Sequence, residues 1–182
     1  QLGAHSLRFN GAFQSLDRDL DSSFPSRFNA ESWVGDVFGK FVFTEQLYLV
    51  AGVNAQRNKM ESASIPFGET RFVKDIKSND AYFSIFDVYA NAVYHSSDGL
   101  QINAGGRIND HNKYGTHGVF NINPSYTFKF NDQYLKVLGS YSSAFITPSL
   151  FQLFAGGFGN EDLDPERNFT TEGGLEWGLD QK

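Results

Sequence analysis

Alternation of apolar and polar residues at every second position is the feature that most constrains the fold of this chain. It is clearest from Leu100 to His111, where one set of alternate positions is apolar or small and the other is polar or Gly. Successive side chains of a β-strand point to opposite faces, so this segment predicts a strand with one apolar wall and one polar wall. Helical periodicity is nearly absent from the rest of the sequence. The chain is therefore predicted to be all-β.

The same pattern predicts eight strands. Their expected ranges are residues 3–16, 32–44, 46–58, 80–95, 99–111, 118–130, 133–146 and 168–180. Most are longer than the five or six residues of an ordinary globular strand, and they reach the roughly 9–11 residues that a strand needs to cross a bilayer. The segment 81–95 is apolar on both faces, so its alternation does not decide which side chains share a face.

The connections between these strands alternate in length. Short turns are expected at residues 44–46, 96–99 and 131–133, and longer polar connections at 17–31, 59–79, 112–117 and 147–167. Short turns at one end and long loops at the other are typical of an outer-membrane barrel. A soluble sandwich or lipocalin can show this layout by chance. Together with the strand lengths and the family resemblance of residues 141–166, the layout predicts an antiparallel up-and-down transmembrane β-barrel segment, about eight strands of a larger barrel. Within the last loop, residues 149–154 have the apolar spacing of one or two helical turns.

Aromatic residues make up 16% of the chain. Several flank the short turns, where membrane barrels carry aromatic girdles because such rings have one apolar end and one end that reaches water. The predicted girdle consists of Phe43, Tyr48, Tyr94, Phe128, Phe130 and Tyr134.

Composition excludes several other classes. The net charge of −6 and the absence of a basic stripe argue against a nucleic-acid partner, and the lack of Cys excludes disulfides and thiol chemistry. No Ser, His or Gly motif of a hydrolase or nucleotide-binding enzyme occurs, so no enzyme activity is predicted. The sequence contains no run of about 20 apolar residues, so no transmembrane helix is predicted. The first residues lack the features of a signal peptide, so a mature product or a piece of a longer chain is expected.

Two elements near the C-terminus carry a resemblance to a known family. Residues 141–148 end in Phe145 and Pro148, and residues 159–166 contain Asn160, Leu163, Pro165 and Glu166. An aromatic-x-x-Pro element, a long outer loop and an Asn-x-x-Leu-x-Pro-Glu element in this order resemble a box in the barrels of TonB-dependent outer-membrane receptors. The similarity extends back through residues 105–111 and 123–126, and thus covers the last part of the chain best.

The resemblance implies a receptor of the bacterial outer membrane that imports a scarce chelate, of the ferric siderophore or cobalamin type, without chemistry on it. The whole barrel would have about 22 strands with a plug in its lumen. Residues 1–182 would be part of one β-barrel domain, with the N-terminal plug and the C-terminal strands absent. The implied partners are the chelate, the lipid bilayer and the protein TonB, which would bind through the absent N-terminal region.

Candidate site residues come from the inward-facing strand positions and from the outer loops. Ligand contacts are predicted for Arg107 and Asn109 on a strand and for Phe158 and Asn160 in the last loop. The carboxylates of Asp17, Asp19 and Asp21 alternate at a strand edge and are candidates for a Ca²⁺ site, although Ca²⁺ takes six to eight oxygen ligands and a solvated loop remains the alternative. Glu161, Asp162 and Asp164 form a second acidic set, and His111 and His117 could share a metal only if their loop folds back. No other cofactor is expected. Haem is disfavoured because residues 149–158, where haem receptors of the family usually carry a His, contain none.

Two alternatives stay open from the sequence. A complete small barrel of eight strands in the outer membrane fits the strand count, and a soluble lipocalin-like binder of small molecules fits the alternation. If the chain is instead a piece of a larger barrel, its first and last strands have free edges, so the isolated fragment is expected to form oligomers through them.

Overall fold

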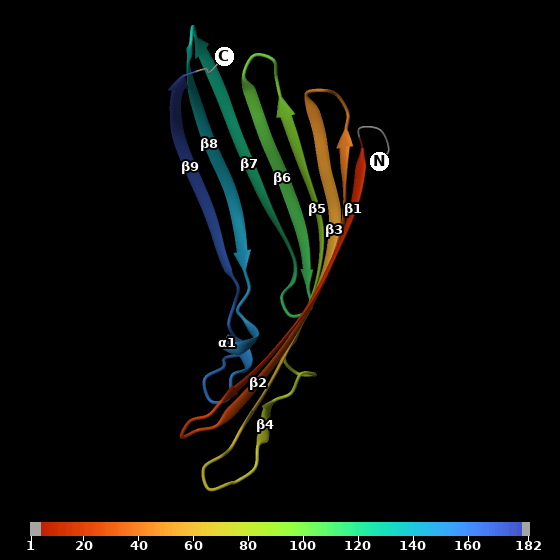
Figure 1. The fold of residues 1–182 in the computed structure, drawn as a ribbon, viewed down its shortest axis with the longest axis vertical. Coiled ribbons are helices and arrows are strands. Elements are labelled where there is room, and N and C mark those ends of the chain that lie inside the picture. Colours follow the sequence, from red (N-terminus) through yellow and green to blue (C-terminus); the bar gives the residue numbers. More distant parts are fainter. Residues whose placement is uncertain (1–4, 180–182) are drawn as a thin grey trace.

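Residues 5–179 of the computed structural model form one antiparallel sheet with a single short helix at one end (Figure 1). The elements are β1 (Ser6–Leu20), β2 (Ser26–Val42), β3 (Leu47–Ser64), β4 (Val73–Ile76), β5 (Tyr82–His95), β6 (Leu100–His111), β7 (Gly115–Phe130), β8 (Gln133–Ile146), α1 (Leu150–Phe154) and β9 (Glu166–Leu179). The long strands follow one another in the order β1-β2-β3-β5-β6-β7-β8-β9, and β4 pairs with the end of β3. The sheet is not closed, so β1 and β9 are its edges. The predicted all-β meander is confirmed.

No helix in residues 5–179 is long and apolar enough to cross a membrane.

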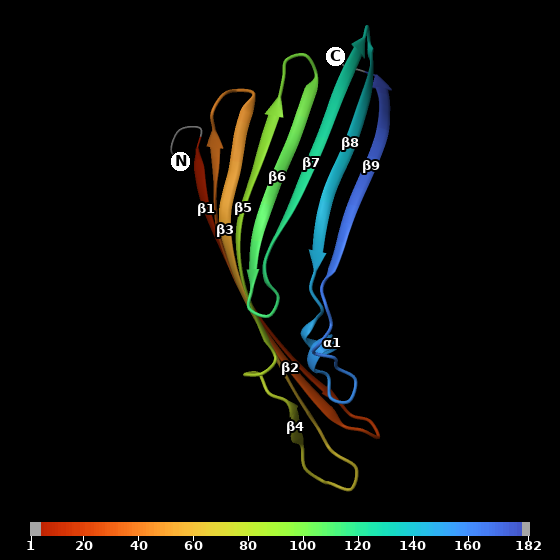
Figure 2. The ribbon, with the colours of Figure 1, turned by 180° about the vertical axis from the view of Figure 1, so that it is seen from behind.

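The long strands join at their two ends by connections of different length (Figures 1 and 2). Residues 43–46, 96–99 and 131–132 connect them at one end, which we call the turn end. Residues 21–25, 65–81, 112–114 and 147–165 connect them at the other, which we call the loop end. Residues 65–81 and 147–165 are long connections as predicted, whereas residues 21–25 and 112–114 are about as short as the connections at the turn end.

Several strands extend further toward the loop end than predicted. β1 runs to Leu20, β2 begins at Ser26 and β3 ends at Ser64, so the first long connection is only residues 21–25. In the added parts the outer positions are polar, whereas the inner positions include Leu20, Phe28 and Met60, so the alternation of the apolar band is lost while the backbone ladder continues. The short β4 was not predicted, because four residues are too few for a periodic pattern. Residues 3, 4 and 180 of the predicted strands lie outside the described residues.

The register assigns the two faces of the sheet. Val37, Val53, Val88 and Ile108 lie opposite one another along four neighbouring strands, on what we call the outer face. Asp36, Asn54, Asp87 and Asn109 form the next row, on the inner face. Because side chains alternate along each strand, these two rows decide the orientation of the segment 81–95 that the sequence left open. Val88 faces outward, and Asp87 and Tyr89 face inward.

The outer face carries an apolar band whose height suits a bilayer. On β2 the band runs from Phe41 near the turn end to Trp33, eight residues at about 3.4 Å each, or about 27 Å along the strand. Phe13 of β1 packs on Trp33 with ring centroids 4.3 Å apart. Beyond Trp33 the outer positions are Glu31, Asn29 and Arg27. The band therefore ends within the sheet, and the strands continue past it toward the loop end.

The predicted aromatic girdle at the turn end is correct only in part. Phe128 and Phe130 lie on the outer face and stack with centroids 6.5 Å apart. Tyr48 lies on the inner face, where Lys40 approaches its ring at 4.1 Å. Tyr134 also faces inward and hydrogen-bonds to Glu176 at 2.6 Å. Proximity to a turn determines how far along the strand an aromatic ring lies. The alternation of side chains along the strand determines which face of the sheet the ring is on.

The buried apolar residues among those described gather at the loop end. They are Ile76, Ala81, Phe83, Leu153 and Ala155. They join the connection around β4 to the β8–β9 loop, which contains α1. This loop lies on the inner face, since Phe151 of α1 contacts Phe28 of β2 with ring centroids 6.4 Å apart. The small core therefore ties the last loop to strands at the opposite side of the sheet.

The helix α1 forms because its first turn is capped. The Ser149 hydroxyl accepts a hydrogen bond from the Gln152 N–H at 3.2 Å, and the Ser149 N–H donates to Oε1 of Gln152 at 2.8 Å. Leu153 is 1% exposed and anchors the helix. The helical turn predicted for residues 149–154 is confirmed.

The two faces predict different tolerance to charge. We expect Ala104→Arg, in the middle of the outer face of β6, to weaken folding into liposomes by about 2–4 kcal/mol, because the charge meets the middle of the bilayer. Asn103→Arg is the matched control, since it lies at nearly the same depth on the inner face and should cost much less. Urea titrations of both variants measure the difference, and equal penalties would contradict the assignment of the faces.

The open edges predict association of the isolated chain. The outer edges of β1 and β9 present unpaired backbone groups, and Phe9, Leu175 and Trp177 beside them are strongly exposed. Such an edge is a template for pairing with another strand. We expect residues 1–182 alone to form oligomers in detergent-free buffer, as measured by light scattering coupled to size exclusion. A monodisperse monomer would count against both the free edges and the apolar outer face.

Candidate functional site: the inner wall and the loop end

The inner face carries a network of polar side chains centred on Asp87 of β5. Asp87 is 3% exposed and lies 3.4 Å from the guanidinium of Arg107. The Asn109 amide donates a short hydrogen bond to the other carboxylate oxygen. A buried carboxylate without partners would be costly, so the cation and the amide from β6 are what permit Asp87 at this position. Since Arg107 is half exposed, the pair contributes less to stability than a fully buried one.

A second set of contacts crosses three strands through Tyr89. Its hydroxyl donates to Asp36 of β2 at 2.9 Å, and the Asn10 amide of β1 donates to the same carboxylate at 3.2 Å. To reach Asp36, the Tyr89 side chain passes over Gly52 of β3. A Cβ at residue 52 would lie 2.8 Å from the Tyr89 hydroxyl and 2.6 Å from Cβ of Phe38. Glycine is therefore required here by the close approach of a neighbouring side chain.

Arg107 and Asn109 face inward as predicted, and the structure brings them together on Asp87. Their role as ligand contacts stays a prediction. The guanidinium of Arg107 also lies 5.5 Å from the Tyr89 ring. Arg107 thus links the Asp87 and Tyr89 contacts into one polar surface on β5 and β6, with part of its side chain open to solvent.

Phe158 and Asn160 occupy the β8–β9 loop but differ in environment. Phe158 is 92% exposed at the tip of the loop. Asn160 is part of the loop's own structure: its N–H donates to the Gln152 carbonyl at 2.9 Å, and its side chain accepts from the Asp162 N–H at 3.0 Å. Phe158 is therefore free to contact a ligand, whereas the Asn160 side-chain oxygen already shapes the turn. Within residues 5–179, neither Phe158 nor Asn160 forms a hydrogen bond to the Asp87 network.

The three aspartates predicted as a Ca²⁺ site lie at the end of β1 and in the turn after it. Asp17 and Asp19 are part of β1 on the outer face, and Asp19 pairs with Arg27 at 3.4 Å. Asp21 begins the turn. No group of three or more Asp, Glu, His or Cys side chains in residues 5–179 is arranged to hold a metal. Calcium binding here stays a prediction.

His111 and His117 both occupy inner positions of the β6–β7 hairpin, close to its turn. His111 is 2% exposed and packs against Phe83 and Tyr114. Its Nδ1 accepts the Lys113 N–H at 3.1 Å, which places the proton of the neutral ring on Nε2. Burial lowers the pKa of His111 and raises the pKa of Tyr114. The ring is therefore neutral at physiological pH and acts as a packing element of the loop end.

The loop end is held together by contacts between the long connections. The Tyr114 hydroxyl donates to the Leu163 carbonyl at 3.1 Å, which ties the β6–β7 turn to the β8–β9 loop. Lys113 lies 5.7 Å from the ring of Phe154 in α1. The connection expected at residues 112–117 is therefore a tight turn of residues 112–114, tied to the last loop through Tyr114.

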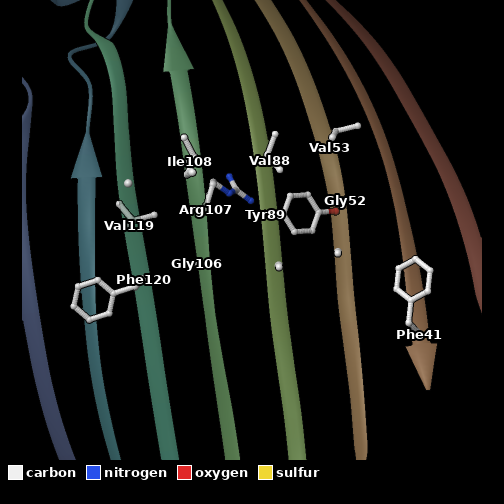
Figure 3. A pocket seen from close by; sticks show the side chains of 13 residues that line it. Phe41, Gly52, Val53, Val88, Tyr89, Gly106, Arg107, Ile108, Val119 and Phe120 are labelled. Atoms are coloured by element: carbon white, nitrogen blue, oxygen red, sulfur yellow. The ribbon is translucent and has the colours of Figure 1, made fainter. Parts of the chain in front are cut away.

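The outer face has a broad depression of about 860 Å³ in the apolar band. Its floor consists of small residues, Ala51, Ala90, Gly106 and Gly118, on four neighbouring strands. Its sides are apolar residues that Figure 3 shows from close by, namely Phe41, Val53, Val88, Ile108 and Phe120. The depression opens on the outer face, and its lining also includes Tyr89 and Arg107 of the neighbouring inner positions.

The inward positions of β6 follow from its alternating sequence, but the partners of these residues do not. Asp87 and Tyr89 lie in the segment whose apolar residues occupy both faces, so the alternation does not show which face their side chains are on. Asp36 and Asn10 come from strands far away in sequence. The only signal that could have found them is the polar character of Asp87 within an apolar segment, because a buried carboxylate requires partners.

Comparison with known proteins places this architecture in a family. The model of the TonB-dependent receptor-like β-barrel matches residues 2–181. Among solved structures, the chain is similar to the copper transporter OprC, with a TM-score of 0.65 and 15% identity over 96% of this chain and 33% of that one. It is also similar to the siderophore receptor PirA from Pseudomonas aeruginosa, with a TM-score of 0.58 and 18% identity over 96% of this chain and 37% of that one. The chain spans about a third of the length of these structures.

The close packing around Gly52 can be tested by adding one methyl group. We expect Gly52→Ala to destabilise the folded wall by about 1–3 kcal/mol, because its Cβ would overlap Phe38 and the Val37 carbonyl oxygen. Gly35→Ala is the matched control: residue 35 lies in β2 on the outer face, where an added Cβ meets nothing within 4 Å. Urea unfolding in liposomes would measure both. A Gly52→Ala variant as stable as Gly35→Ala would contradict the close packing of this wall.

Proposed function

Because the chain belongs to the TonB-dependent receptor β-barrel family, we propose that it forms part of the wall of a receptor that captures a scarce chelate outside the cell and imports it. The family consists of receptors and transporters of the outer membrane, and this chain is part of an outer-membrane barrel. The import proposal concerns the whole receptor, of which this chain is a segment.

The observation that carries the proposal is the division of the wall into two surfaces. The outer face is an apolar band of bilayer height, and the inner face presents amides, hydroxyls and the Asp87–Arg107 pair. A wall with a polar inner surface suits a lumen through which a polar solute passes. The structured loop end above that surface supplies a mouth where a solute can first be held.

We propose a metal chelate of the ferric siderophore or cobalamin type as the cargo. PirA is a siderophore receptor and OprC a copper transporter, and both support a metal-linked solute for a barrel of this shape. Phe158 at the loop tip would make the first contact, and Arg107 and Asn109 would line the path further in. The cargo would pass unchanged, and energy for import would come from TonB acting on the whole receptor.

Uptake by the whole receptor tests this function. Cells that carry it as their sole receptor of this kind should accumulate at least one solute from a panel of ferric siderophores, cobalamin and copper complexes. Accumulation should stop when TonB is deleted. A receptor that supports uptake of none of them, while correctly inserted in the outer membrane, would contradict the proposal.

The role of the loop tip can be tested separately. We expect Phe158→Ala to reduce the initial rate of uptake at limiting chelate several-fold without loss of folded receptor, because residue 158 makes no packing contact that its removal would break. Phe43→Ala is the control, since Phe43 is also well exposed but lies at the turn end. Equal uptake by both variants and the wild type would exclude Phe158 from capture.

A further inference from the structure

We propose that the cavity between α1 and the inner face of β1, β2 and β3 binds an uncharged arm of the cargo, with an apolar ring or alkyl body and a hydrogen-bond acceptor such as a carbonyl oxygen. This inference rests on the proposed function, which it extends by assigning a place and a chemistry for part of the ligand. The cavity lies at the loop end, on the side that leads into the lumen.

The cavity has a size and a lining suited to a small organic group. Its volume is about 330 Å³, at the lower end of the usual range for small-molecule sites of about 300–1,000 Å³. The inward side chains of β1, β2 and β3 form one wall and α1 forms the other. The apolar part of the lining consists of Leu16, Ala30, Met60, Leu150 and Phe151.

The position of α1 is fixed before any ligand arrives. The cap at Ser149 holds its first turn, and Leu153 is buried in the core of the loop end. Leu16 and Phe151, in contrast, are 54% and 53% exposed although they face an aqueous mouth. A fixed helix that leaves apolar side chains open on both sides of a gap is preorganised to bind an apolar group between them.

Asn58 supplies a directional contact in this otherwise apolar lining. Its amide oxygen accepts hydrogen bonds from the Ser32 hydroxyl at 2.7 Å and from the Gln56 amide at 3.2 Å. Both contacts use the oxygen, so the amide N–H groups of Asn58 are left to donate, and residue 58 lines the cavity. A ligand that offers an acceptor oxygen at this point would satisfy them.

The charges around the cavity favour an uncharged arm. Glu31 and Lys59 border it, but the register places both on the outer face, with their side chains directed away from the inner wall. The inward residues of the lining carry amides, a hydroxyl and apolar groups. An ionic group placed here would lose water without gaining a partner of opposite charge.

Binding of a small fluorinated probe to the whole receptor tests the subsite. 4-Fluorobenzamide has a ring and a carbonyl oxygen, and 4-fluorobenzylammonium has a similar ring with a charge. Fluorine NMR titration should show saturable binding of the amide and none of the ammonium compound. Met60→Trp, which fills the cavity, and Asn58→Ala, which removes the donor, should each weaken the amide at least about ten-fold, the equivalent of one lost hydrogen bond or contact.

Val53→Trp is the control, because residue 53 lies on the same strand but on the outer face and should leave the titration unchanged. No binding of the amide would overturn the subsite, as would equal binding of the ammonium compound or unchanged affinity in both cavity variants. The uptake assay separates this inference from the proposed function. Normal uptake by a Met60→Trp receptor that no longer binds the probe would overturn the subsite as a place for cargo and leave import standing.

Discussion

In hydrocarbon, a peptide N–H or C=O without a hydrogen-bond partner costs several kcal/mol, and this constraint governs the whole wall. Each long strand pairs with its neighbours in sequence, from β1 to β9, so most backbone groups of the interior strands are satisfied between strands. The ladder between β7 and β8 is the exception, since it is interrupted at Asn123 and Pro124 and ends at Asn121. Pairing in turn fixes the register, and register fixes which side chains meet lipid. The valine row at Val37, Val53 and Val88 and the polar row beginning at Asp36 are two consequences of the same ladder.

Between the turn end and the loop end, the single sheet of residues 5–179 has no hydrophobic core, and the inner face is stabilised by polar contacts between strands. Its polar groups are paired across strands, with Asp87 held from β6 and Asp36 from β1 and β5. Tyr89 spans the width of β3 because Gly52 leaves room beneath it. A shift of one residue in this register would turn these groups toward lipid and the valines toward the lumen, so the contacts also oppose slippage. The lumen surface and the strand register therefore support each other.

The sequence predicted the strands best where one face is lipid and the other is polar. Alternation from Leu100 to His111 identified β6 to within one residue, and the turns at the turn end were equally clear. It failed at the ends of β1 and β2 beyond Trp33, where the outer positions become polar and the inner positions include Leu20, Phe28 and Ala30, because the polarity of the two faces there no longer follows that of the middle of the strands. The same holds for the site. The alternation along β6 predicts that Arg107 faces inward, but its pairing with Asp87 depends on the register between β5 and β6. The cavity beneath α1 joins residues 14–60 to residues 149–151, and no local pattern contains that contact.

The packing of the β8–β9 loop on β2 and β3 has a consequence for how the sheet folds. Neighbouring strands of the meander contact each other at short sequence separation, so the sheet can grow one hairpin at a time. The packing of α1 on Phe28 and β3 is different, because it joins segments about a hundred residues apart and requires every strand between them to be in place. The contacts of α1 with β2 and β3 can therefore form only when the first strands and the last loop have come together, so they connect the two sides of the arc in a way that no single hairpin can.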